Sequence, residues 1–558
     1  MKLKKIFFIS IAFAAVLSSC KKFDSMLDNP NSPRPDAASA DLYLTQAQLA
    51  FAGFFNTASS FGMEVTRQIV MYGPRYDNAY QPQSFDGIWG TAYTSVLKHI
   101  NALIPVATTE KKFVNVAMAK IMKAYTIMTL VDMFGNIPVA EANLGSENTN
   151  PAATSGKDAY AAAIALLDEA LADLDKPTGA YPGTQDLFFG TTGAAGVTRW
   201  KAVARTLKLR AYLNTRLVDN TAKTKIDALL TQDIIDTQAE DFEFKYSTKQ
   251  ANPNSRHPRY NGNYSATGSA GDYMGTWFMW ALVQEKGSFN NNNPAADNSD
   301  PRTRYYFYRQ RTTYADVNSQ TSSCSVSPTP AHFPAGMPFC LTTSGFWGRD
   351  HGDNSGIPPD GNRRTTVGIY PYGGDFDANQ GTSVALNRGG QGAGIQPIWL
   401  SVFTEFLKAE SALILGTAGD PRVLLESGVR KSMTKVIGFP ATVNVAPPST
   451  LVPDATKINN YVNKVLALYD AAATNNERLD VIIKEYYIAL WGNGLDAWNN
   501  YRRTGKPTNM QPTIDPNPGS FTRSMLYPSV YVNRNVNAQT KTVDVQVFWD
   551  TNPAGFIK

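Results

Sequence analysis

The sequence predicts a mainly α-helical protein, and three observations support this fold class. Apolar residues recur at helical spacing over residues 41–239 and again over residues 397–510. Between these regions, residues 240–396 are dense in Gly, Asn, Pro, Ser and aromatic residues, a composition typical of loops. Several helices follow one another as pairs, with small residues on one face and large residues on the next. We therefore expect one domain, residues 41–558, in which a helical scaffold carries a loop-rich insertion.

The N-terminus has the pattern of an export signal. MKLKK is basic, IFFISIAFAAV is apolar but too short to span a bilayer, and LSSC follows. This order resembles a bacterial lipoprotein signal, which predicts a signal peptide over residues 1–19 and lipidation of Cys20. An ordinary secretion signal with an incidental cysteine is the alternative. Residues 20–40 are polar and proline-rich, as expected for a tether between the lipid and the folded body.

The first part of the scaffold, residues 41–239, carries a series of helical patterns. Asp41 suits the N-cap of the first helix, and Gly135 with Pro138 ends the third. Pro177 stops the alanine-rich fourth helix. The expected helices are residues 41–55, 89–104, 114–134, 156–177, 198–217 and 225–235.

Residues 240–396 differ in kind from the scaffold. SFNNNNPAADNSDP, TSSCSVSPTPAHFPAGMP and GFWGRDHGDNSGIPPDGNRR are loops by composition. An irregular stretch of this length inside a compact domain is usually functional. We therefore expect the ligand to bind to these loops.

Helical patterns return after residue 396, and the expected helices are residues 397–416, 421–437, 458–472 and 476–494. Their paired arrangement has roughly the length of tetratricopeptide repeats, although no full repeat consensus is present. Stacked helix pairs would bury one another's apolar faces and leave loops on one side as a binding surface. The C-terminal residues 521–535 and 542–549 alternate more like short strands and extended coil.

Charge and cysteine content exclude some functions. The chain has 52 basic and 47 acidic residues, and loss of Lys2, Lys4 and Lys5 with the signal leaves 49 basic residues. This near-neutral balance gives no electrostatic footprint for nucleic acid. Besides Cys20, only Cys324 and Cys340 occur, and their spacing is compatible with one loop-stapling disulfide or with two free thiols.

No motif predicts catalysis, a metal site or a cofactor. The four histidines lack metal-ligand spacing, and neither a nucleophile elbow nor a phosphate-binding loop occurs. Glu405 and Glu410 are five residues apart on one helix and point to different faces, so they do not form a glycosidase pair. Asp350 and Asp353 lie in a loop, where turn formation is the expected role and calcium binding the alternative.

Aromatic side chains in loops are the remaining candidates for ligand binding. Such rings stack on the C–H faces of sugars and also anchor peptide interfaces. The structural alternative is that they pack beneath the loops as small cores. The candidate ligand-binding residues are Tyr76, Tyr80, Trp277, Trp280, Tyr306, Trp347, Tyr370 and Tyr372.

The segment GLDAWNNYRRTGKP, residues 494–507, mixes aromatics with arginines and is a further candidate. Trp498 and Tyr501 are three residues apart and share a helix face that suits inward packing. Arg502 and Arg503 can satisfy carbonyls at the helix end or pair with carboxylates. We therefore predict a structural role for this segment.

Several blocks together resemble one known family. AKIMKAYTIMTLVDMFGNIPVAEA, RWKAVARTLKLRAYL, SVFTEFLKAESALILG, EYYIALWGNGLDAWNNYRRTGKP, RSMLYPSVYVNRN and FWD occur in this order after the lipoprotein signal. They resemble the SusD/RagB-like outer-membrane lipoproteins of the Bacteroidetes over nearly the whole mature chain. The D-x-F-G-x-I-P and W-x-x-Y-R-R-T-G blocks are the most specific parts of the match.

The resemblance implies a tetratricopeptide-like helical scaffold with a looped ligand-binding half. It also implies a lipid-anchored, surface-exposed protein of the outer membrane whose partner is a TonB-dependent SusC-like barrel. Members capture glycans, or in some branches peptides, without catalysis and deliver them to the barrel. Peptide capture is therefore the alternative within the family, and a surface glycoside hydrolase is the rival from another class.

Overall fold

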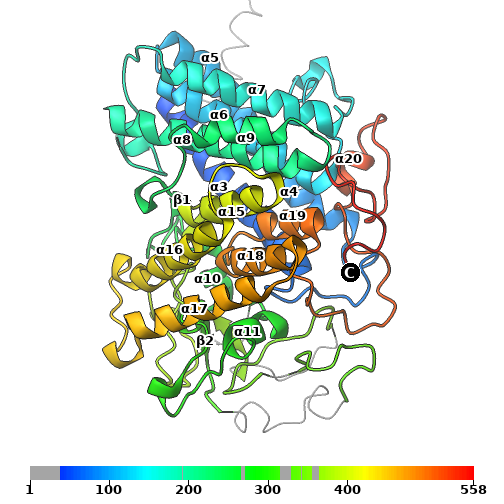
Figure 1. Ribbon diagram of the computed structural model, residues 1–558. Coiled ribbons are helices and arrows are strands. Elements are labelled where there is room, and N and C mark those ends of the chain that lie inside the picture. The colour runs from blue at the N-terminus through cyan, green and yellow to red at the C-terminus, as the bar shows by residue number, and fades with distance from the viewer. Residues whose placement is uncertain (1–37, 192, 265–270, 314–327, 341, 355–362) are drawn as a thin grey trace, which may run out of the picture.

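Helices dominate the computed structural model of this chain, which describes residues 38–191, 193–264, 271–313, 328–340, 342–354 and 363–558 (Figure 1). The predicted signal peptide, Cys20 and nearly all of the predicted tether lie outside the described residues. The first helices are α3 (Ala40–Val65), α4 (Asp86–Gly90), α5 (Lys98–Thr109), α6 (Phe113–Phe134), α7 (Gly156–Leu174), α8 (Gly193–Asn214) and α9 (Ala222–Leu230). A π-helical turn, η3 (Thr91–Leu97), joins α4 to α5.

Helices α5 to α9 form one end of the molecule (Figure 1). Helix α6 packs against α5 and α7, α7 packs against α8, and α8 packs against α9. Among the described helices, α6 alone is long and apolar enough to cross a membrane, but 89% of its most apolar window is buried inside the protein. It is therefore the core helix of this layer, and Gly135 at φ 82° ends it as predicted.

A second helical array consists of α15 (Ser401–Leu415), α16 (Pro421–Thr442), α17 (Ala455–Ala471) and α18 (Asn475–Ala489). Helix α15 packs against α16, α16 against α17, and α17 against α18, which returns to α15. The side chain of Asp420 accepts hydrogen bonds at the start of α16, and Thr474 with Glu477 forms a capping box on α18. The predicted arrangement of consecutive helix pairs is confirmed in this array.

The start and the end of the scaffold meet where α3 crosses α19 (Gly494–Thr504). The two backbones approach so closely that a Cβ atom on Gly62 would lie 2.1 Å from the carbonyl oxygen of Gly494. The Ser59 hydroxyl donates to the Gly492 carbonyl at 2.7 Å and accepts from the Gly494 N–H at 2.9 Å. Only glycine permits this contact, since any side chain would separate the helices.

Helix α19 confirms the structural role predicted for residues 494–507. Trp498 and Tyr501 are buried, and the guanidinium of Arg502 lies 3.7 Å from the Trp498 ring centroid. Arg502 donates to the Arg523 carbonyl at 2.6 Å, and Arg503 makes a bidentate ion pair with Glu410. The aromatic and arginine side chains of this segment therefore hold the fold together.

The loop-rich insertion gathers at the opposite end from α5–α9 (Figure 1). Its short helices are α10 (Pro258–Asn263), α11 (Thr276–Val283) and α12 (Thr303–Tyr306). Strand β1 (Phe242–Lys245) pairs antiparallel with β4 (Ile395–Trp399), and β2 (Phe307–Arg309) pairs antiparallel with β3 (Thr365–Val367). The β1–β4 pair closes the insertion at its two ends, next to the scaffold.

Two local predictions were wrong, and a third, for the C-terminal residues, was right about irregular chain but wrong about strands. Ser39 caps α3 through its side chain, whereas Asp41 pairs with Lys112 at 2.9 Å. The segment before Ser401 is strand β4, because PIW is buried on all sides and pairs with β1. The C-terminal residues 505–558 contain no strand. They cover the scaffold as irregular chain with the short helix α20 (Ser529–Val532).

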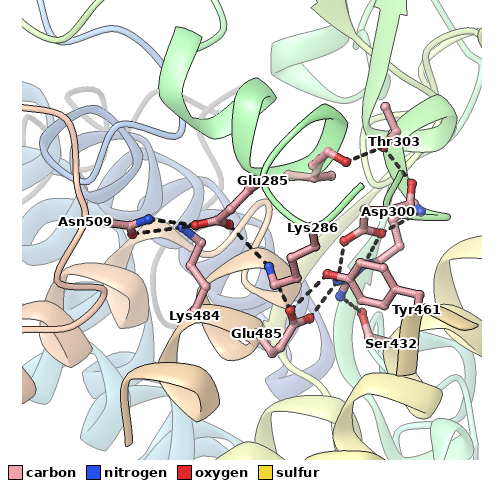
Figure 2. Close-up of polar contacts among 11 residues, drawn as sticks. Glu285, Lys286, Asp300, Thr303, Ser432, Tyr461, Lys484, Glu485 and Asn509 are labelled. Carbon is pink, nitrogen blue, oxygen red and sulfur yellow. Dashed lines mark hydrogen bonds and ion pairs between the residues drawn. The ribbon is translucent and has the colours of Figure 1, made fainter. Parts of the chain in front are cut away.

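A row of alternating buried charges joins the insertion to the second array (Figure 2). In order, its members are Lys484, Glu285, Lys286, Glu485, Arg302 and Asp300, with neighbouring ion pairs at 2.9, 3.3, 3.1, 3.0 and 2.6 Å. Lys484 and Glu485 belong to α18, and the other four belong to the insertion. Tyr461 of α17 and Ser432 of α16 also bond to the row. It therefore fixes the loops on the helices.

The electrostatics of this row favour the ionised forms of two of its carboxylates, Glu285 and Asp300. Burial alone would raise the pKa of Glu285, but Lys484, Lys286 and a hydrogen bond from Asn509 outweigh it and hold the pKa at about 2. Burial likewise opposes ionisation of Asp300, and the Arg302 guanidinium lowers its pKa below the usual range. Each charge thus depends on its neighbours, and the six charges sum to zero.

Candidate ligand-binding surface

The eight aromatic residues predicted from the sequence are mostly part of the core. Seven of them are at most 9% exposed, namely Tyr76, Tyr80, Trp277, Tyr306, Trp347, Tyr370 and Tyr372. Trp280 is partly buried, and the Lys484 ammonium lies 6.0 Å from its ring centroid. Contact of these eight residues with a ligand stays a prediction. The seven buried rings have a packing role in the structure.

The packing role is clearest around Trp491. The Tyr306 ring stacks on Tyr370 at 5.8 Å and on Trp491 at 6.0 Å, and its hydroxyl donates to the Ile488 carbonyl. Tyr372 packs edge-on against the same indole at 5.4 Å. These rings form a small core between the insertion and α18, as the structural alternative proposed.

Three extended segments meet beside this core and form a rigid mount. Residues 68–70 run antiparallel to residues 273–275, with Val70 N–H donating to the Tyr273 carbonyl at 2.9 Å. On the other side, Gly275 forms a parallel bridge with Arg349. A Cβ atom on Gly275 would lie 2.0 Å from the Arg67 carbonyl oxygen, so glycine is required for this approach.

The mount presents a cluster of tyrosine and arginine side chains. Tyr72 is 47% exposed, and the Arg349 guanidinium lies 6.0 Å from its ring centroid. The same guanidinium lies 4.3 Å from the Tyr273 ring, and that of Arg364 lies 4.7 Å from it. Cation–π contacts of this kind fix the rings and the guanidinium planes relative to one another. We call Tyr72, Tyr273, Arg349 and Arg364 the tyrosine–arginine surface, of which Tyr72 is the exposed member and the other three, at 4–8% exposed, are buried behind it.

Polar side chains support this surface from beneath. Asp272 pairs with Arg259 at 2.5 Å and accepts from the Asn263 amide at 2.9 Å. The Arg364 guanidinium donates to the Gly271 carbonyl at 3.2 Å. Arg259 and Asn263 therefore hold the side chain of Asp272, the residue before Tyr273, and this orients the segment that carries Tyr273.

A carboxyl group with a raised pKa lies next to these residues. Loss of hydration is the largest cause that raises the pKa of Glu64 to about 7, and a hydrogen bond from the Tyr80 hydroxyl opposes it. The negative charge of Asp272 raises it further. Glu64 can therefore donate or accept a proton close to neutral pH.

The acidic residues weighed for catalysis or calcium have structural partners. Glu410 is buried between Arg503 and Arg216, and Glu405 pairs with Lys431 at 2.7 Å. The Asp353 N–H donates to the Asp350 carbonyl at 3.1 Å, which is the turn predicted for this loop. Burial raises the pKa of Asp350 to about 7, and its carboxyl accepts from Gln511 and from the Cys340 N–H.

Within the residues that the structure describes, no group of three or more His, Cys, Asp or Glu side chains is placed to hold a metal ion. Cys340 is disulfide-bonded, and Cys324 lies outside the described residues.

The tyrosine–arginine surface offers one exposed ring with its hydroxyl group, that of Tyr72, in front of buried arginine and tyrosine side chains. Such a set can stack on the C–H face of a sugar ring and bond to its hydroxyl groups. The sequence analysis did not single out any of these four residues, although Tyr72 lies next to the GPRYDNAY loop and Tyr273 lies near Trp277. The missed signal was pairing between distant segments, which aims Tyr72 outward while Tyr76 and Trp277 turn inward.

Two family models match the chain. A model described as "Starch-binding associating with outer membrane" matches residues 34–320, and one described as "Susd and RagB outer membrane lipoprotein" matches residues 394–547. No curated protein sequence matches the chain.

Solved structures match over almost the whole chain. A chitin-binding protein is 18% identical, covering 93% of this chain and all of its own, with a TM-score of 0.64. A SusD homologue from Bacteroides fragilis is 16% identical over 92% of this chain and all of its own, with a TM-score of 0.64. A chitin-binding SusD homologue from Flavobacterium johnsoniae is 18% identical over 91% of this chain and 99% of its own, with a TM-score of 0.59. These structures share the fold of this chain.

Proposed function

Because this chain belongs to the family of SusD-like and RagB-like outer-membrane lipoproteins, we propose that it captures glycans without catalysis and delivers them to a TonB-dependent SusC-like transporter. Carbohydrate binding is a property of the family, and two similar structures are of chitin-binding proteins. A lipid on Cys20 holds the protein on the outer membrane with its folded body facing outward.

The observation that carries this proposal is the exposed ring of Tyr72 on the tyrosine–arginine surface. The buried guanidinium of Arg349, 6.0 Å from the ring centroid, holds the ring in place, so that its exposed face is a platform for stacking. The mount beneath is held by backbone hydrogen bonds and by close glycine contacts, so little conformational freedom is lost on binding. A rigid, shallow platform suits the transient holding that transfer to a transporter requires.

Glycan and peptide arrays on the soluble form that starts after Cys20 test the proposal. Tyr72→Ala is expected to weaken binding of the captured glycan by about 2- to 12-fold through loss of stacking. Tyr72→Phe should keep most of the affinity because the ring remains. Tyr181→Ala is the matched control, since Tyr181 is 46% exposed in a segment held against the α5–α6 turn.

Other outcomes would overturn the proposal. Retention of wild-type affinity by Tyr72→Ala for every bound glycan would place the ligand elsewhere. Binding of peptides alone would favour the peptide-capturing alternative. Release of reducing ends from a polysaccharide by the purified chain would show a hydrolase instead.

A further inference from the structure

A cavity of about 880 Å³ is lined by Tyr76 and by residues that follow α19. The irregular chain after α19 and the C-terminal segment form most of its wall, and His332 with Pro334 adds the rim from the insertion. Its volume is within the roughly 300–1,000 Å³ of small-molecule sites. The cavity is therefore large enough for a sugar residue or a short oligosaccharide.

Aromatic rings line this cavity, and one of them is open to solvent. Phe556 is 38% exposed, and its ring rests on Gly505, where a Cβ atom would lie 2.9 Å from the ring. Behind it, Phe521 packs edge-on against Tyr501 at 5.2 Å and against Tyr76 at 5.1 Å. The buried rings hold the wall rigid, and Phe556 offers a ring face to a ligand.

Acidic and basic groups both line the cavity: Asp515 and Asp544 are carboxylates, and Lys558 contributes an ammonium group. Asp544 and Gln546 are exposed at its edge, and Asp515 lies in its wall. The Arg523 guanidinium is already neutralised by a bidentate pair with Asp550. Carboxylate and amide oxygens accept hydrogen bonds from hydroxyl groups and repel anions. With Arg523 neutralised, two carboxylates against the one ammonium of Lys558 leave the lining with a surplus of negative charge, which favours a neutral sugar over an acidic one.

The cavity and the tyrosine–arginine surface share a wall. The segment that carries Arg349 continues to Gly352, where a Cβ atom would lie 2.9 Å from Pro74 and 3.3 Å from Thr513. The His351 carbonyl accepts from the Ile514 N–H at 3.0 Å, so this segment bonds directly to the cavity wall. The two sites thus lie on either side of one chain segment.

We infer that this cavity is a second subsite, in which neutral residues of the same glycan bind against Phe556. This inference rests on the proposed function and deepens it, because it assigns a neutral, extended oligosaccharide as the ligand class. Two subsites on one chain raise the affinity for long ligands through effective concentration, whereas a short ligand fills only one.

Calorimetric titration with neutral oligosaccharide ladders, N-acetylglucosamine and maltose oligomers from dimer to octamer, tests the inference. Phe556→Ala should weaken binding of the long oligomers by about 2- to 12-fold and leave binding of the dimer unchanged. Val536→Ala, at a residue that is 85% exposed in the C-terminal region, is the control and should change neither. Asp544→Asn, at an exposed position, provides a second variant if Phe556→Ala fails to fold.

The outcomes separate this inference from the proposed function. Suppose that the wild type binds the oligosaccharide ladder and that Tyr72→Ala weakens this binding. If Phe556→Ala and Asp544→Asn then change the affinity for no oligomer, or for oligomers of all lengths equally, the second subsite is wrong and the proposed function stands. If the wild type binds no glycan on the ladder or on the arrays, both are overturned.

Discussion

Replacing Glu485 by glutamine should destabilise the protein strongly, because it removes one charge from the buried row in Figure 2. The Glu485 carboxylate is fully buried and pairs with Lys286 at 3.1 Å and Arg302 at 3.0 Å, and it accepts from the Tyr461 hydroxyl at 2.9 Å. Glutamine keeps the volume and one acceptor but leaves a surplus positive charge away from water. Removing one partner of such a buried group costs about 3–5 kcal/mol, a large part of the total stability of a domain.

Urea unfolding followed by tryptophan fluorescence gives the free energy of unfolding for this comparison. Asp470→Asn is the control, since Asp470 pairs with Arg422 on the surface and the change should leave the midpoint unaltered. The double variant Glu485→Gln with Lys286→Met should recover part of the loss, because the remaining four charges again sum to zero. If Glu485→Gln is as stable as Asp470→Asn, the charges of the row do not stabilise the fold.

Two further perturbations probe the α3–α19 contact and the buried carboxyl. Gly62→Ala should lower the free energy of unfolding by about 1–3 kcal/mol, because the added methyl group meets the Gly494 carbonyl. Gly53→Ala in the same helix is the control: its methyl group has nothing within 4 Å, and the change should raise the free energy of unfolding by about 0.5–1 kcal/mol. Equal thermal midpoints of the two variants would contradict this reasoning. The raised pKa of Glu64 means that its ionisation opposes folding, so the wild type loses stability as pH rises from about 4.5 through 7. Glu64→Gln should remove up to about 3 kcal/mol of this pH dependence, and less where solvent reaches the carboxyl. The measurement is the difference in the free energy of unfolding between pH 5 and pH 8. An equal difference in the wild type and in Glu64→Gln would refute the prediction.

The scaffold was predictable because its signals are local. Apolar periodicity, proline and glycine at helix ends and capping residues gave α6 and α16 to α18 within a few residues. Where local signals failed, a distant partner decided. PIW forms a strand because residues 242–245, about 150 positions earlier, offer it a pairing edge.

The candidate site was less predictable, because aromatic composition does not say which way a ring points. Tyr76 and Tyr72 lie in the same loop, yet Arg67 and His351 bond to the first and bury it. The second is 47% exposed because its neighbours pair with the segment around Tyr273. Orientation here depends on contacts between segments about 200 to 280 residues apart, and no local pattern encodes them.

The contact between α3 and α19 also constrains how the chain reaches its native state. Ser59 bonds to a carbonyl 433 positions later, and the chain is synthesised from its N-terminus. Met63 of α3 is buried in the finished protein, next to Gly494 of α19. Until α19 has been made, α3 lacks one of the helices that it packs against. A nascent or truncated chain without α19 thus leaves this face of α3 uncovered, so the packing of a helix near the N-terminus is completed only after residues 494–504 have been made.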